Sequence, residues 1–232
     1  MSGSKEHQRR EKPKVSVMIA DLDNTLYDWV EMWSRAFAAM LSVLVRESGI
    51  LEQTLEKDFH TVFQRHGTSE YAFAIEELPS LRRKFPGEKL SDKFRDAISA
   101  YRNARKNALR LYPEVLETLN KIRSKGCLIV GYTESMAFYT AQRMRCLGLD
   151  GVLDYLYCPR DHAMPRGLTR RQVRQYPDEY YELKHTLQKW TPKGILKPNK
   201  RVLLNIMSDV GADPAETVYV GDNLMKDMLM AQ

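Results

Sequence analysis

Four short apolar runs, rich in β-branched and aromatic residues, are separated along the chain by stretches with the spacing of amphipathic helices. They are residues 15–20, 127–130, 152–157 and 217–220. Runs of this length are typical of strands buried on both faces of a parallel sheet, and parallel strands need long, usually helical, crossovers. The pattern therefore predicts an α/β fold, a Rossmann-like doubly wound parallel sheet with helices on both faces.

The stretch between the first two runs is far longer than a crossover requires. Residues 27–110 carry apolar side chains at helical spacing and contain no run typical of a strand. We interpret them as an all-helical domain inserted into an α/β core formed by residues 15–26 and 111–232. Residues 1–14 are polar and basic, and we expect them to form a disordered tail.

Composition excludes several classes of protein. The longest apolar stretch, residues 36–45, is about half as long as a membrane-spanning helix requires. The first residues lack the apolar core of a secretory signal. Three cysteines without a CxxC pair favour neither a disulfide framework nor a zinc site. We therefore expect a cytoplasmic protein with no membrane contact.

The net charge of +6 is concentrated in two segments. The tail carries +3, and residues 159–200 carry +6, including an Arg run at 166–174. Residues 159–196 are irregular in pattern, so we interpret them as a basic insert within the core that could form a flap. Because the rest of the chain is slightly acidic, the charge does not favour nucleic acid as a partner.

Polar side chains follow three of the predicted strands. They are Asp21, Asp23, Thr133, Asp222 and Asp227. The carboxyl ends of parallel strands meet at one edge of a sheet, where ligands bind. Crowded carboxylates suit Mg²⁺, which prefers hard oxygen ligands, and a carboxylate can attack phosphorus to form an aspartyl-phosphate. Lys197 is the right type of residue to neutralise the charge.

These residues fall into four short motifs. In chain order they are Asp21-Leu-Asp-Asn-Thr25, an apolar strand that ends at Thr133, Lys197-Pro198, and Gly221-Asp222 with Asp227. The set resembles the four motifs of the haloacid dehalogenase superfamily: DxDxT, a strand ending in Thr or Ser, a lysine, and GDxxxxD. All four occur in the family's order at predicted strand ends. The chain thus resembles the phosphatase branch that carries a helical cap.

The resemblance implies catalytic roles for three residues. Asp21 would be the nucleophile that takes the phosphoryl group. Asp23 would be the general acid for the leaving group and then the base for the hydrolytic water. Lys197 would neutralise the nucleophile and the phosphate.

The resemblance also implies binding roles. Thr133, Asn24 and Thr25 would bind or support the substrate, with Thr133 holding a phosphoryl oxygen. The expected Mg²⁺ ligands are Asp21, Asp23 through its backbone carbonyl, Asp222 and Asp227. Asp227 could act through water or by orienting Lys197, and Asn223 is a weaker candidate.

The implied function is Mg²⁺-dependent hydrolysis of a small phosphorylated metabolite. Dehalogenases of the superfamily lack the second Asp of the first motif, so Asp23 indicates phosphate chemistry. Residues 27–110 lie where the family places its first type of cap, which would close over the substrate and exclude water. Residues 159–196 lie near the entry point of the second type, and could form part of one.

Two alternative functions stay open at this point. The same site could transfer phosphate within a sugar, as a mutase does. A catalytically degenerate or truncated member could instead act as a binding module. Ten residues follow Asp222, which leaves room for one helix and no fifth strand, so we also expect an exposed sheet edge beside the fourth predicted strand.

Overall fold

The computed structural model describes residues 15–161 and 177–232. The described chain divides into two compact units. The first contains the residues up to Tyr27 together with those from Leu111 onward, and the second is the continuous range Asp28–Arg110. The predicted tail 1–14 and the Arg run at 166–174 lie outside the described residues.

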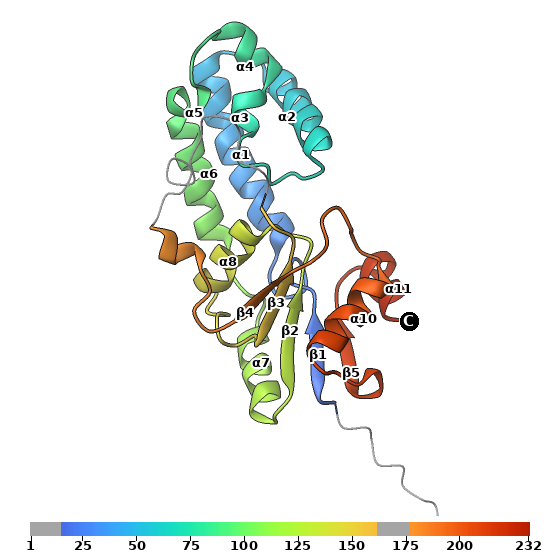
Figure 1. The fold of residues 1–232 in the computed structure, drawn as a ribbon. Helices are drawn as coiled ribbons and strands as arrows, with labels where there is room; N and C mark the ends of the chain where they lie inside the picture. Colours follow the sequence, from blue (N-terminus) through green and yellow to red (C-terminus); the bar gives the residue numbers. More distant parts are fainter. Residues whose placement is uncertain (1–14, 162–176) are drawn as a thin grey trace, which may run out of the picture. The chain divides into compact units, whose positions relative to one another are not determined.

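The first unit is built around a five-stranded sheet in the order β4-β3-β2-β1-β5, in which all neighbouring strands are parallel (Figure 1). In chain order the strands are β1 (Val17–Ala20), β2 (Leu128–Tyr132), β3 (Tyr155–Cys158), β4 (Leu187–Trp190) and β5 (Thr217–Val220). Four of them coincide with or overlap the apolar runs. The sheet confirms the predicted α/β fold class.

Strand β4 corrects the prediction that residues 159–196 are irregular throughout and that the sheet has four strands. Its end residues Leu187 and Trp190 are 60% and 42% exposed, so it carries no buried apolar run. It is held instead by parallel pairing with β3 at one end of the sheet. Because β4 is an exposed edge strand, its pairing with β3 needs no buried apolar run in its sequence.

Helices cover both faces of the sheet. Among the described residues, the helical elements of this unit are α7 (Val115–Ser124), α8 (Ala137–Cys146), η1 (Asp178–Tyr181), α10 (Lys200–Asp209), η2 (Pro214–Glu216), η3 (Leu224–Met228) and α11 (Leu229–Ala231). Ile19 and Val130 pack in one cluster with Ile206 of α10. Gly131 faces the other side, where an added Cβ would lie 2.7 Å from Leu153. The sheet is therefore packed closely on both faces.

The second unit is helical. Between Asp28 and Arg110, a range described without a gap, every regular element is a helix. The helices are α1 (Trp29–Ser48), α2 (Glu52–His66), α3 (Ala74–Glu77), α4 (Pro79–Lys84), α5 (Leu90–Lys93) and α6 (Arg95–Ala108). The unit has its own core, in which Leu44, Phe59 and Phe94 are almost fully buried. It can therefore be stabilised by its own packing.

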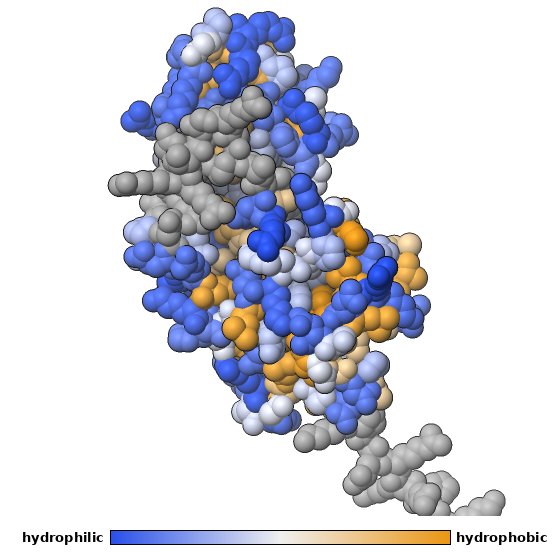
Figure 2. Space-filling model, viewed as in Figure 1, coloured by the Kyte–Doolittle hydropathy of each residue, from blue (hydrophilic) through white to orange (hydrophobic). Residues whose placement is uncertain are grey.

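Apolar side chains on the surface gather in the first unit. Figure 2 shows them around β5, α10 and α11, where Leu204, Leu224 and Leu229 are exposed. β5 pairs with β1 and lies at one end of the sheet, with Val218 and Val220 each 39% exposed. No helix in the described ranges combines the length and apolarity needed to cross a bilayer.

Candidate active site

A tight turn follows β1 and presents the first site residue. The backbone N–H of Asp21 donates to the carbonyl of Val220 at 2.8 Å, which extends the pairing of β1 with β5 by one residue. The N–H of Leu26 donates to the carbonyl of Leu22 at 2.9 Å. Asn24 adopts the left-handed conformation at φ 59°, which Asn tolerates better than most residues. Asn24, expected to bind substrate, thus shapes the turn that holds Asp21.

Lys197 brings two of the expected carboxylates together. Its ammonium lies 2.5 Å from an oxygen of Asp21 and 3.0 Å from an oxygen of Asp227. The side chains of Lys197 and Asp227 are 2% exposed and that of Asp21 is 11% exposed. The ammonium also lies 4.7 Å from the centre of the Tyr132 ring. The lysines nearest to it in the sequence, Lys193 and Lys200, are exposed.

Burial dominates the electrostatics of Asp21. Removal from water raises the pKa of its carboxyl to about 6, and the nearby Lys197 ammonium opposes that rise. The negative charges of Asp227 and Asp23 raise the pKa further. A further cation would stabilise the ionised form of Asp21, because one lysine does not balance the charge of the surrounding carboxylates.

This raised pKa predicts a pH dependence of stability. Between about pH 4 and pH 6 the folded state holds a proton on Asp21 that the unfolded chain has lost. The contribution of Asp21 to the free energy of unfolding therefore falls as the pH rises through this interval, by about 3 kcal/mol at most. Denaturant unfolding in a chelating buffer measures this, and Asp21→Asn should flatten the fall. Identical pH profiles of the two proteins would contradict it.

Asp227 enters the site because Gly221 has no side chain. A Cβ at Gly221 would lie 2.4 Å from the carboxyl carbon of Asp227. One oxygen of Asp227 accepts from Lys197 and from the Tyr219 hydroxyl at 2.8 Å, and the other accepts from the backbone N–H of Asn223 at 3.1 Å. Both oxygens are thus engaged, which suits a carboxylate that orients Lys197.

Three carboxylates could hold a metal ion. Each of Asp21, Asp222 and Asp227 offers one oxygen, and these oxygens lie within 4.8 Å of one another. Asp222 is exposed on the loop after β5, so its side chain has room for water or a substrate oxygen beside it. With Lys197 as the cation among them, the three carboxylates leave an excess of negative charge. This donor set fits Mg²⁺.

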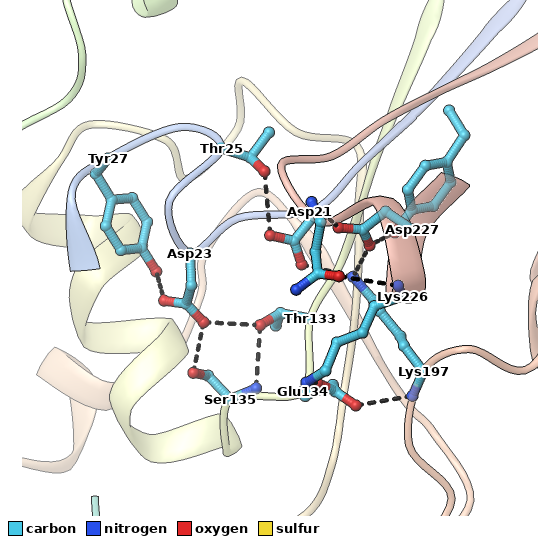
Figure 3. A network of polar contacts seen from close by, with 12 residues as sticks. Asp21, Asp23, Thr25, Tyr27, Thr133, Glu134, Ser135, Lys197, Lys226 and Asp227 are labelled. Carbon is cyan, nitrogen blue, oxygen red and sulfur yellow. Dashed lines mark hydrogen bonds and ion pairs between the residues drawn. The ribbon is translucent and has the colours of Figure 1, made fainter. Parts of the chain in front are cut away.

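Asp23 takes a different direction from Asp21, as Figure 3 shows. Its carboxylate accepts from the hydroxyls of Tyr27 at 2.6 Å, Ser135 at 2.6 Å and Thr133 at 3.2 Å. It also forms an ion pair with Arg143 at 3.0 Å. Asp21 instead accepts from Lys197 and, at 3.2 Å, from the Thr25 hydroxyl.

Thr133 links the end of β2 to Asp23 in the turn after β1. Its backbone N–H donates to the carbonyl of Tyr157 at 3.0 Å, which fixes its place at the end of β2. Its hydroxyl donates to Asp23 and accepts from the backbone N–H of Ser135 at 3.0 Å. Thr133 is buried, so its hydroxyl is held at the edge of the sheet beside Asp23.

Glu134 joins three of the four motif loops. One of its oxygens accepts from the backbone N–H of Lys197 at 2.7 Å, and the other accepts from the ammonium of Lys226 at 2.6 Å (Figure 3). Lys226 lies in η3, directly before Asp227. Glu134 therefore ties the loops that carry Thr133, Lys197 and Asp227 to one another.

The sequence patterns missed four residues of this network. Tyr27 could have been considered from the sequence, since it lies two residues after the first motif, which ends at Thr25. Ser135 belongs to none of the four motifs, but it lies two residues before α8 and its hydroxyl donates to Asp23. Glu134 and Arg143 had no signal, because isolated charged residues are common in this chain. The eight site residues expected from the sequence all lie at one edge of the sheet or in the turn that follows β1.

Comparisons with known proteins agree with this geometry. The model of the haloacid dehalogenase-like hydrolase family matches residues 15–232. A glyceraldehyde 3-phosphate phosphatase from Methanopyrus kandleri is 20% identical over 217 residues, which cover 92% of this chain and 78% of the relative.

Solved structures show the same fold. A HAD phosphatase from Thermococcus onnurineus has a TM-score of 0.54 at 17% identity, covering 93% of this chain and 81% of that one. A 2-haloacid dehalogenase from Pseudomonas syringae also has a TM-score of 0.54, at 18% identity, covering 94% of this chain and 82% of that one.

The fold and the site place an acidic centre with a buried lysine at the carboxyl edge of a parallel sheet. The family match spans nearly the whole chain. The chain belongs to the haloacid dehalogenase-like hydrolases.

Proposed function

We propose that this hydrolase is a Mg²⁺-dependent phosphatase that acts on a small phosphomonoester through an aspartyl-phosphate at Asp21. The observation that carries the proposal is the buried contact of Lys197 with Asp21 and Asp227, with Asp222 beside them. A catalytically degenerate binding module would have no need for this buried carboxylate–lysine centre, so its presence favours the enzyme. The phosphatase from Methanopyrus kandleri supports the same class of reaction.

The presence of Asp23 favours phosphate chemistry over dehalogenation. Folds alone do not separate the two reactions, since a phosphatase and a dehalogenase give the same TM-score. A dehalogenation needs no acid for its halide leaving group, whereas an alkoxide leaving group needs a proton. Asp23 lies two residues from Asp21 in the chain and accepts from the hydroxyl of Thr133, so in its protonated form it can supply that proton near the phosphoryl group.

The first step of the proposed reaction transfers the phosphoryl group. A carboxylate oxygen of Asp21 attacks phosphorus, and the bond from phosphorus to the ester oxygen breaks. Asp23, which takes up a proton from solvent before the first turnover and from the hydrolytic water in each later one, gives that proton to the ester oxygen, so the leaving group departs as an alcohol. Lys197 and the hydroxyl of Thr133 balance the charge on the phosphoryl oxygens.

The second step releases phosphate. Asp23, now a carboxylate, takes a proton from a water molecule as that water attacks phosphorus. The bond between phosphorus and the Asp21 oxygen breaks, which returns Asp21 to its carboxylate form. The same residues that stabilise charge in the first step do so again.

Asp21 and Asp222 would hold Mg²⁺, together with the backbone carbonyl of Asp23. The ion, when bound, neutralises phosphoryl oxygens and orients them toward the nucleophile. Asp227 has both oxygens engaged by protein donors, so its proposed task is to place Lys197.

The helical unit Asp28–Arg110 is proposed to act as a cap that excludes water during the reaction. It is a compact unit that begins one residue after the turn containing Asp23 and Tyr27. The proposed location is the cytoplasm, since the three cysteines Cys127, Cys146 and Cys158 are free thiols.

The proposed function is tested by measuring phosphate release from a panel of phosphomonoesters, with Mg²⁺ and with a chelator. We expect release with Mg²⁺ on at least one member, and a loss of at least about 100-fold with the chelator. Analysis of the organic product separates hydrolysis from transfer within a sugar. Absence of release on every member, with the protein folded, would overturn the proposed function.

A further inference from the structure

We propose that Arg143 is a positioning residue, which fixes the carboxylate of Asp23 for proton transfer at the leaving group. The inference rests on the proposed function, because it concerns the residue assigned there as acid and base. Neither the sequence motifs nor the roles given above include Arg143.

The contact between the two residues is direct and buried. Arg143 lies in the second half of α8, and its side chain is 3% exposed. One guanidinium nitrogen lies 3.0 Å from an oxygen of Asp23 and 3.2 Å from the hydroxyl of Ser135. The same hydroxyl donates to the other oxygen of Asp23 at 2.6 Å. Arg143 therefore contacts Asp23 both directly and through Ser135.

The guanidinium is itself held in place. Its central carbon lies 6.0 Å from the ring centre of Tyr27 and 5.8 Å from that of Tyr139. Because an arginine side chain presents planar, fixed donors, burial between rings leaves it few orientations. The positive charge of Arg143 is therefore held in one place beside Asp23.

The contact of Arg143 with Asp23 becomes more important when substrate binds. A threonine hydroxyl has one proton, and that of Thr133 is donated to Asp23 in the structure. When Thr133 donates to a phosphoryl oxygen instead, Asp23 loses that hydrogen bond. Tyr27, Ser135 and Arg143 then hold it, and Arg143 is the charged member of the three. Hydrogen bonds between charged groups are shorter and stronger than neutral ones.

The experiment uses the full chain with Arg143→Met and two substrates in single-turnover measurements. An alkyl phosphate needs a proton on its leaving group, whereas p-nitrophenolate leaves without one. We expect Arg143→Met to slow alcohol release about 100-fold, and p-nitrophenolate release less than about threefold. Arg143→Lys restores the charge without the planar donors, and should recover part of the loss.

A control and a second readout make the result decisive. Arg145→Met removes an arginine from the same helix, one that contacts the carbonyl of Glu179, and should leave both rates unchanged. Thermal unfolding of Asp23→Asn, Arg143→Met and the double variant tests the pair without activity. The double variant should lose less than the sum of the two single losses.

Several outcomes would overturn the inference. Equal slowing of both substrates would assign Arg143 a structural role, and additive thermal losses would show that the pair is not coupled. A wild-type protein that releases no phosphate from any substrate would instead refute the proposed function, which the panel of phosphomonoesters tests separately. An active wild type with an unaffected Arg143→Met variant refutes only the inference about Arg143.

Discussion

Asp21→Asn is expected to abolish phosphate release while leaving the fold intact. The amide has the size of the carboxylate, but it is a poor nucleophile toward phosphorus, so turnover should fall by at least about 10⁴-fold. Folding should be largely preserved, because Lys197 keeps its ion pair with Asp227 and burial disfavours the ionised carboxyl that the amide replaces. Circular dichroism and denaturant unfolding test the fold, and phosphate release tests the turnover.

Asp209→Asn is the matched control for this experiment. Asp209 lies in the same unit, where it accepts from Lys189 at 2.7 Å, and no proposed step involves it. We expect full activity from this variant. Retention of more than about a tenth of the wild-type turnover by Asp21→Asn, after exclusion of deamidation back to Asp, would refute the assigned nucleophile.

Lys197→Met is expected to cost both activity and stability. Lys197 is buried between two carboxylates, so its removal leaves Asp21 and Asp227 without their shared cation. Breaking a buried ion pair by removing one partner typically costs about 3–5 kcal/mol. Loss of the charge that balances the phosphoryl oxygens should also lower turnover by about 10³-fold.

The exposed neighbour Lys193 supplies the control, since Lys193→Met removes a lysine four residues away. This variant should match the wild type in stability and turnover. Denaturant unfolding in a chelating buffer keeps any metal from compensating the lost charge. If Lys197→Met were as stable and as active as Lys193→Met, the central role of Lys197 would be wrong.

Much of the fold follows from local patterns. β1 and β2 are almost entirely buried and have no polar face, so their apolar runs identify them in the sequence. β5 is half exposed, and its valines still mark it as a strand. β4 lacks such a run, because its place depends on hydrogen bonds to β3, and no local pattern encodes a neighbour.

The candidate site could be predicted where a residue directly follows a strand. Asp21 and Thr133 are placed by the ends of β1 and β2, and Asp222 by the end of β5, so strand prediction locates them. Arg143 is 120 residues from Asp23 in the chain, and only the packing of α8 on the sheet brings the two together. Glu134 likewise acts through a loop that no periodicity describes.

The direction of the Asp23 side chain also lay beyond the sequence. Alternation in an extended segment places Asp21 and Asp23 on one face. The turn after β1 begins at Leu22, whose carbonyl accepts from the N–H groups of Thr25 and Leu26, so the alternation ends before Asp23. Asp23 consequently meets Tyr27, Ser135 and Arg143, while Asp21 meets Lys197.

Chemical trapping of the phosphorylated residue identifies the nucleophile itself. The protein is mixed with its substrate, quenched in acid and reduced with borohydride, which converts an aspartyl-phosphate to homoserine. Mass spectrometry of the peptides then locates the change. We predict homoserine at position 21 in the wild type treated with substrate, and none in Asp21→Asn. Homoserine at another aspartate, or a phosphoryl group on a different side chain, would contradict the account.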